Sequence, residues 1–119
     1  MTGTAVVIVV VTVVMNAFSG IAALLHWKAI RPGMAKANVP ESWLTFPIGT
    51  LKTAGAAGLL AGLVLDAPWL VVAAAIGLVL FFVCALYTHV QAADYTAQFG
   101  LAAVFLGAAS ASLVFTLTA

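Results

Sequence analysis

The sequence carries very little charge for its length. Charged residues make up 6% of its 119 positions, hydrophobic residues make up 66%, and the mean hydropathy is +1.26. A soluble domain carries roughly 25% charged residues. So few charged side chains cannot cover a water-exposed surface, which excludes an ordinary soluble globular protein and predicts a chain whose solvent is largely lipid.

Cysteine is almost absent, and neither sign of charge dominates. Cys84 is the only cysteine, which excludes an internal disulfide and an intramolecular dithiol relay. The net charge of +1 provides no basic surface, so nucleic acid is excluded as a partner. The sequence also lacks a glycine-rich phosphate loop and a His-Glu-x-x-His metal motif, and no metal site is predicted.

Long apolar runs are what the sequence does have. Four of them, at about residues 4–25, 47–65, 69–87 and 96–117, are long enough to cross a bilayer as helices. The first lacks a basic leading region and is too long for the hydrophobic part of a secretory signal. The predicted fold class is therefore all-α, a polytopic membrane protein in which a single domain, residues 1–119, forms an antiparallel bundle of four transmembrane helices.

The basic residues predict the orientation of this bundle. Lys28, Arg31 and Lys36 lie in the connection between the first two spans, and Lys52 follows shortly after it. The positive-inside rule places that connection in the cytoplasm. The protein is then expected in the cell membrane as a multi-pass protein, with both termini and the turn at Asp66 outside.

Polar and titratable side chains gather at one predicted end of the bundle, because the first and third connections share a membrane face. Such a gathering is typical of a binding site, although polar residues belong at helix ends in any membrane protein. Both interpretations remain open for the set, whose members are His26, Trp27, Glu41, Lys52, Cys84, Tyr87, His89, Asp94, Tyr95 and Gln98.

Lys52 is the most informative member of this set. It lies about five residues inside the second span, roughly 7–8 Å along the helix, so its side chain could extend to the membrane surface. Its helical position instead places it on the side of Gly55 and Gly62, which indicates a bundle-facing side chain. Inside the bundle the ammonium would require an acidic or carbonyl partner, and the candidates are Glu41 and Asp94.

Two further polar features allow a structural and a functional interpretation. Asn16 lies in the middle of the first span, where an unpaired amide is costly; it is expected either to bond another helix or to line a pocket. His26 and His89 could together ligate a metal or haem, but no third or fourth ligand lies at a diagnostic spacing, so haem is disfavoured.

Small residues recur at helical spacing in two spans. Gly58 and Gly62 form such a pair in the second span, and Gly100, Ala103, Gly107 and Ser110 form a stripe in the fourth. Stripes of this kind let helices approach closely. They predict close packing within the bundle or between copies of the chain in a homo-oligomer.

Three segments carry a resemblance to a known family: "NAFSGIAALLHWK", "NVPESWLTFPIGTLKTAGAAGLLAGL" and "GLVLFFVCALYTHVQAADY". With them the chain resembles the DoxX-like family of small four-helix integral membrane proteins. The resemblance implies a four-helix membrane bundle and a link to redox chemistry, since relatives include a subunit of a thiosulfate:quinone oxidoreductase. It implies no catalytic motif, so no site residue is carried over from it.

The favoured hypothesis is a protein that binds a lipophilic molecule, preferably a quinone, at the cytoplasmic end of its bundle in a redox-linked role. A membrane or soluble oxidoreductase is the expected partner. The candidate catalytic residues are Lys52, His26, His89, Glu41 and Asp94, and the candidate ligand-binding residues are Lys52, His26, Asn16, Tyr87 and Trp27. Two alternatives stay open: a non-catalytic assembly factor or subunit, and a cofactor-free isomerase or cyclase acting on a hydrophobic substrate.

Overall fold

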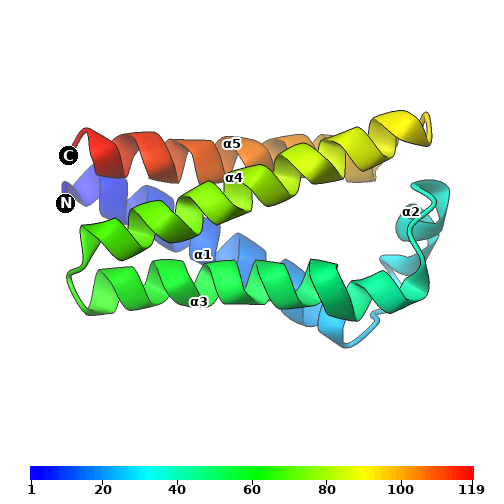
Figure 1. Ribbon diagram of the computed structural model, residues 1–119, viewed down its shortest axis with the longest axis horizontal. Helices are drawn as coiled ribbons and strands as arrows, with labels where there is room; N and C mark the ends of the chain where they lie inside the picture. Colours follow the sequence, from blue (N-terminus) through cyan, green and yellow to red (C-terminus); the bar gives the residue numbers. More distant parts are fainter.

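A computed structural model describes residues 1–119 and is entirely helical, which confirms the predicted fold class (Figure 1). Four helices are long and apolar enough to cross a membrane, if α3 is counted with the turns that lead into it. A fifth, short helix lies between the first two. Their bounds are α1 Gly3–Leu24, α2 Arg31–Lys36, α3 Thr50–Val64, α4 Pro68–Gln91 and α5 Ala97–Leu117.

The four long helices form a closed ring. Helix α1 packs against α3 and α5, α3 packs against α4, and α4 packs against α5. The termini and the α3–α4 turn lie at one end of the bundle, while α2 and the α4–α5 turn lie at the other (Figure 1). Much of the outer surface is apolar and exposed, as expected for helices surrounded by lipid.

Small residues bring α3 and α4 into close contact near the end with the termini. A Cβ atom on Gly62 would lie 2.8 Å from the backbone nitrogen of Val71, and one on Gly58 would lie 3.0 Å from Cβ of Ala74. The glycines of α5 behave differently, because a Cβ on Gly100 or Gly107 would meet nothing within 4 Å. The predicted stripe in α3 therefore packs inside the bundle, whereas the stripe in α5 faces outward.

The helices end in turns that contain no glycine. After each of α1 to α4, one residue adopts a left-handed conformation, with φ between 51° and 59°, and these residues are His26, Asn38, Asp66 and Ala93. The amide of the residue that follows then bonds back to a carbonyl in the last turn of the helix, as in the bond of 2.9 Å from Asp94 N to His89 O. The turn thus places Asp94 directly beside the end of α4.

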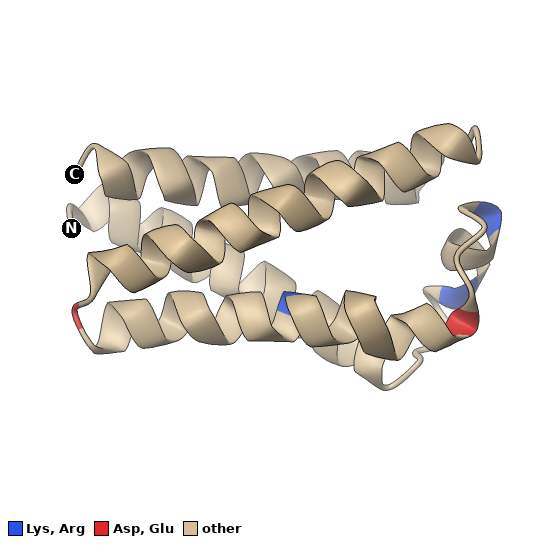
Figure 2. Ribbon diagram, in the orientation of Figure 1, with Lys and Arg blue, Asp and Glu red and all other residues tan.

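The second span begins earlier than the sequence indicates. A tight 3₁₀ turn at Glu41–Leu44 and a wide, kinked turn at Thr45–Gly49 lead directly into α3, so the whole span runs over Glu41–Val64. Lys52 is therefore eleven residues from the start and twelve from the end, at most roughly 16–18 Å from each. Lys52 thus lies midway along this candidate span (Figure 2), and its distance from the membrane surface stays a prediction.

The contrast between the two glycine stripes gives a test of the fold. Gly62→Ala is expected to lower the free energy of unfolding by about 1–3 kcal/mol, because the added methyl group meets the backbone of α4. Gly107→Ala is the matched control and should leave stability unchanged or slightly raised, since its Cβ enters open space. Denaturant titration in mild detergent measures both, and equal effects would contradict the packing described here.

Candidate functional site

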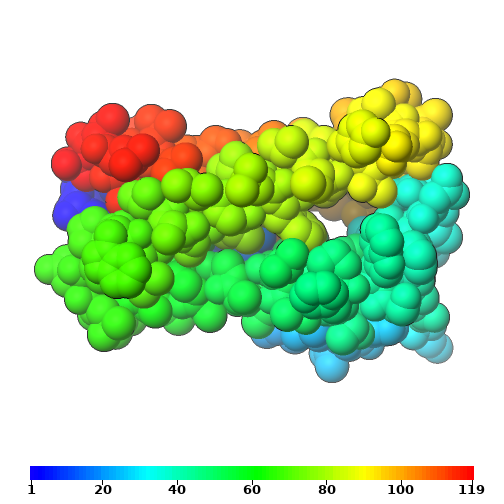
Figure 3. All heavy atoms as spheres, viewed as in Figure 1, coloured from blue at the N-terminus to red at the C-terminus, as the bar shows by residue number.

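A large cavity lies between the helices in the half of the bundle nearest α2. Its volume is about 960 Å³, and 20 of its 27 lining residues are hydrophobic. Helices α3 and α4 lie close together near the termini and diverge toward α2 (Figure 1). Figure 3 shows the surface hollowed where the α4–α5 end approaches the segment around α2. The volume is that of a site for a small lipophilic molecule.

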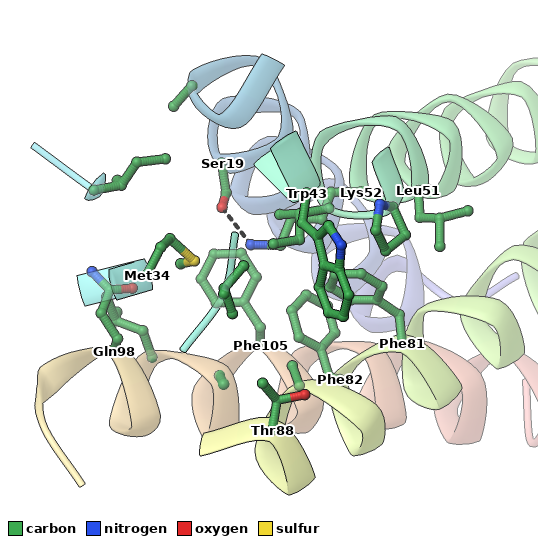
Figure 4. A pocket seen from close by; sticks show the side chains of 18 of the residues that line it. Ser19, Met34, Trp43, Leu51, Lys52, Phe81, Phe82, Thr88, Gln98 and Phe105 are labelled. Carbon is green, nitrogen blue, oxygen red and sulfur yellow. Dashed lines mark hydrogen bonds between the residues drawn. The ribbon is translucent and has the colours of Figure 1, made fainter. Parts of the chain in front are cut away.

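The ammonium group of Lys52 points into this cavity (Figure 4). It donates a hydrogen bond of 2.9 Å to Oγ of Ser19 on α1. Three aromatic rings surround it, with Nζ lying 5.9, 5.6 and 5.4 Å from the ring centroids of Phe81, Phe82 and Phe105. Cation–π attraction and one hydroxyl group therefore stabilise the charge. The bundle-facing direction agrees with the helical position of Lys52 in the sequence.

The carboxylates expected to pair with Lys52 have other partners. Glu41 forms an ion pair with Arg31, whose Nε lies 3.1 Å from Oε1 of Glu41. Asp94 lies 2.9 Å from Nδ1 of His89. The prediction that Glu41 or Asp94 is the partner of Lys52 is therefore wrong. The spacing of residues along the chain could not show these pairings. The turns that follow the helices decide which basic side chain each carboxylate reaches.

His89 and Asp94 form a buried pair at the wall of the cavity. The left-handed turn at Ala93 brings the carboxylate back over the last turn of α4, and both side chains are less than 8% exposed. Hydrogen bonds from Thr96 and from His89 hold the pKa of the Asp94 carboxyl below its usual value. An ionised Asp94 accepts a hydrogen bond from the Nδ1–H group of His89.

The remaining titratable and aromatic candidates lie in different places. His26 bonds Oγ1 of Thr45 through Nε2 at 2.8 Å and does not line the cavity. The hydroxyl of Tyr87 accepts from Gln91 at 3.0 Å, and Tyr87 is exposed and also outside the cavity lining. Trp27 does line the cavity and is half-exposed. The cavity lining thus includes three of the predicted site residues, Lys52, Trp27 and His89. His26 and Tyr87 lie outside it.

Asn16 lies outside the cavity lining and makes its bond within α1. Its Nδ2 donates to the carbonyl of Thr12 at 3.0 Å, and its Oδ1 is buried without a partner. In this part of α1 the hydrogen bond to another helix is instead made by Thr12, whose hydroxyl lies 2.8 Å from that of Ser112 on α5. The polar residue that joins two helices is therefore one turn away from the predicted one.

Sequence reasoning missed the groups that surround the lysine. Neither Ser19 nor the rings of Phe81, Phe82 and Phe105 are among the predicted site residues. A signal was present, because Trp43 to Leu65 reads as one long apolar segment with Lys52 near its middle. A lysine at that depth requires neutral or aromatic neighbours when no acid lies on a facing span.

Comparison with known proteins gives one family. The model of the DoxX-like family matches residues 7–113. No curated protein and no solved structure matches the chain. All the cavity-lining residues, from Val14 to Phe105, fall inside the matched region, so the site belongs to the part of the chain that defines the family.

The His89–Asp94 pair predicts a pH-dependent stability. Asp94→Asn should lower the melting temperature by a few degrees at neutral pH, because the amide cannot replace the charged hydrogen bonds. The pKa of Asp94 is lower in the folded protein than in the unfolded chain. Its stabilisation is therefore present above the ordinary value of about 3.9 and disappears as the pH falls through the lowered pKa.

Melting curves of the two proteins in detergent at a series of pH values test this expectation. Asp66→Asn, at the exposed turn of the opposite end, is the matched control and should have no such effect. A difference between wild type and Asp94→Asn that stays constant into strong acid would contradict the role given to the Asp94 charge.

Proposed function

The chain belongs to the DoxX-like family of membrane proteins, and we propose that it binds a lipophilic molecule in its cavity, with a quinone as the favoured ligand. One observation carries the proposal. An ammonium group midway along a membrane span points into an apolar cavity of about 960 Å³. An ionisable residue at this depth indicates a functional site, and a lysine donor is suited to a ligand oxygen.

The walls of the cavity suit a quinone ring. The ammonium of Lys52 has donor capacity beyond its bond to Ser19 and can bond a quinone carbonyl. The rings of Phe81 and Phe105, which line the cavity and are partly exposed, offer flat apolar contacts for the head group. The lining also includes Leu80 and Leu101, whose side chains are exposed on the outer surface, so a hydrocarbon tail could extend between them toward lipid.

A redox-linked role follows from the second titratable group at the cavity. Reduction of a quinone to a quinol consumes two electrons and two protons. Nε2 of His89, with Asp94 fixing the other ring nitrogen, is suited to exchange one of those protons. The electrons would come from a partner oxidoreductase. Whether the chain itself catalyses the transfer or only holds the ligand depends on that partner.

The proposed site faces the cytoplasm of the cell. Lys28, Arg31 and Lys36 all lie at the α2 end of the bundle, which is also the end nearest the cavity (Figure 2). The positive-inside rule favours a cytoplasmic position for that end in the cell membrane, with the termini outside. A soluble or membrane oxidoreductase could then reach the cavity mouth from the cytoplasm.

The outward stripe on α5 favours a second candidate, a non-catalytic subunit or assembly factor. Gly100, Ala103 and Gly107 are exposed and present a flat surface on which another transmembrane helix could pack. That helix would come from a partner subunit or from a second copy of the chain. A cofactor-free isomerase or cyclase has less support, because neither Glu41 nor Asp94 lines the cavity.

Removing the lysine donor tests the first candidate. Protein purified in mild detergent is expected to yield a quinone in its organic extract, at close to one molecule per chain, or to bind added decylubiquinone. Lys52→Met should lower the bound quinone at least about tenfold, because it keeps the apolar volume and removes a charged hydrogen-bond donor. Mass spectrometry of the extract quantifies the ligand.

The matched control is Lys36→Met, which removes an exposed lysine at the same end of the bundle and should retain the quinone. An empty extract together with no binding of added decylubiquinone would contradict the proposed function. Equal quinone content in Lys52→Met and wild type would show that Lys52 does not contribute to quinone binding.

A bulky residue on the α5 stripe tests the second candidate. Gly107→Leu should reduce association with another transmembrane helix, whether in a homo-oligomer or in a complex, because the isobutyl group separates the backbones. Ala73→Leu on the exposed side of α4 is the control. Crosslinking in native membranes compares the three proteins, and an unchanged crosslinking pattern in Gly107→Leu would exclude the stripe as a docking surface.

A further inference from the structure

The charge of Lys52 has no counter-ion anywhere in the protein. The chain contains three acidic side chains. Glu41 is paired with Arg31, and Asp94 is paired with His89. Asp66 is exposed on the α3–α4 turn, 14 residues beyond Lys52 and thus roughly 21 Å along the helix. The C-terminal carboxylate lies at that same distant end (Figure 1).

The groups that do contact the ammonium are all neutral. Ser19 accepts one hydrogen bond, and three phenylalanine rings lie between 5.4 and 5.9 Å away. Ionisable residues within membrane spans usually pair with an opposite charge or with backbone carbonyls, because a lone charge in an apolar environment is unfavourable. The arrangement around Lys52 therefore leaves a place for one negative charge, facing the cavity.

We propose that this charge belongs to the ligand, and that the cavity binds a single-chain lipophilic carboxylate, a long-chain fatty acid, with its carboxylate at Lys52. The inference rests on the proposed function in one respect, since it also requires the cavity to take a lipophilic molecule. The inference adds a second class of ligand, a fatty acid. It would compete with a quinone for the ammonium group of Lys52.

The depth of Lys52 favours a carboxylate over a phospholipid head group. The ammonium lies near the middle of a 24-residue span, whereas the head group of a two-chain phospholipid remains at the membrane surface. One lysine also matches the single charge of a carboxylate, and no second lysine or arginine lines the cavity for a phosphate. The apolar walls that Phe81, Phe82 and Leu101 contribute can hold one hydrocarbon chain.

The tryptophans provide a direct readout of binding. Trp27 and Trp43 line the cavity, and the third tryptophan, Trp69, begins α4 at the opposite end. In a Trp69→Phe background, all the remaining tryptophan fluorescence comes from cavity-lining residues. Dibrominated stearic acid quenches tryptophan fluorescence on contact, and dibrominated stearyl alcohol is its uncharged counterpart with the same chain.

The experiment titrates both probes into the Trp69→Phe protein in an uncharged detergent at neutral pH. The acid is expected to reach half-maximal quenching at a concentration at least about tenfold lower than the alcohol, because a charged hydrogen bond replaces a neutral one. Adding Lys52→Met should remove this preference, and Lys52→Arg should keep it. Lys36→Met, which changes only surface charge, should also keep it.

The outcomes separate this inference from the function on which it rests. In the Trp69→Phe protein that retains Lys52, equal quenching by the acid and the alcohol would contradict a carboxylate ligand. A preference for the acid that persists after Lys52→Met would contradict it as well. Decylubiquinone bound under either of those outcomes would leave the quinone site standing. Failure of the acid, the alcohol and decylubiquinone alike to bind would overturn both proposals.

Discussion

A single ammonium group midway along a candidate membrane span is the feature around which the cavity end of this structure is arranged. Lys52 lies near the centre of this candidate span, and its Nζ donates to Ser19 and lies between 5.4 and 5.9 Å from the centroids of three phenylalanine rings. Such a charge is tolerated where neutral polar and aromatic groups surround it and lipid is kept away. Helices α3 and α4 diverge at this level (Figure 1), and the cavity that results is the space into which the lysine points.

The bundle is consequently divided into two halves with different packing. Toward the termini, Gly58 and Gly62 let α3 and α4 touch, and Leu59 and Val71 are fully buried between helices. Toward α2, bulky rings and a charged side chain replace these small residues, and about 960 Å³ remains open. The compact half holds the helices together, so the open half can keep a cavity without loss of the fold.

Acidic groups at the cavity end are neutralised locally by the way the helices terminate. Left-handed residues at His26 and Ala93 turn the chain sharply. Arg31, which follows the first of these turns, lies 3.1 Å from Glu41, and Asp94 is placed beside His89. These short-range pairs leave Lys52 as the one cation that faces the cavity. The same turn holds His89 at the wall of the cavity.

Composition and hydrophobic length determined the fold class by themselves, because a backbone in lipid must satisfy its hydrogen bonds within each helix. They also placed Lys52 on the bundle-facing side of its helix, since helical spacing is a local property. The position of Lys52 along its span and the partners of Glu41 and Asp94 were decided only by the tertiary structure. That position depends on how far the turns at Glu41–Gly49 extend the span, and each pairing depends on a left-handed turn for which the sequence has no glycine signal.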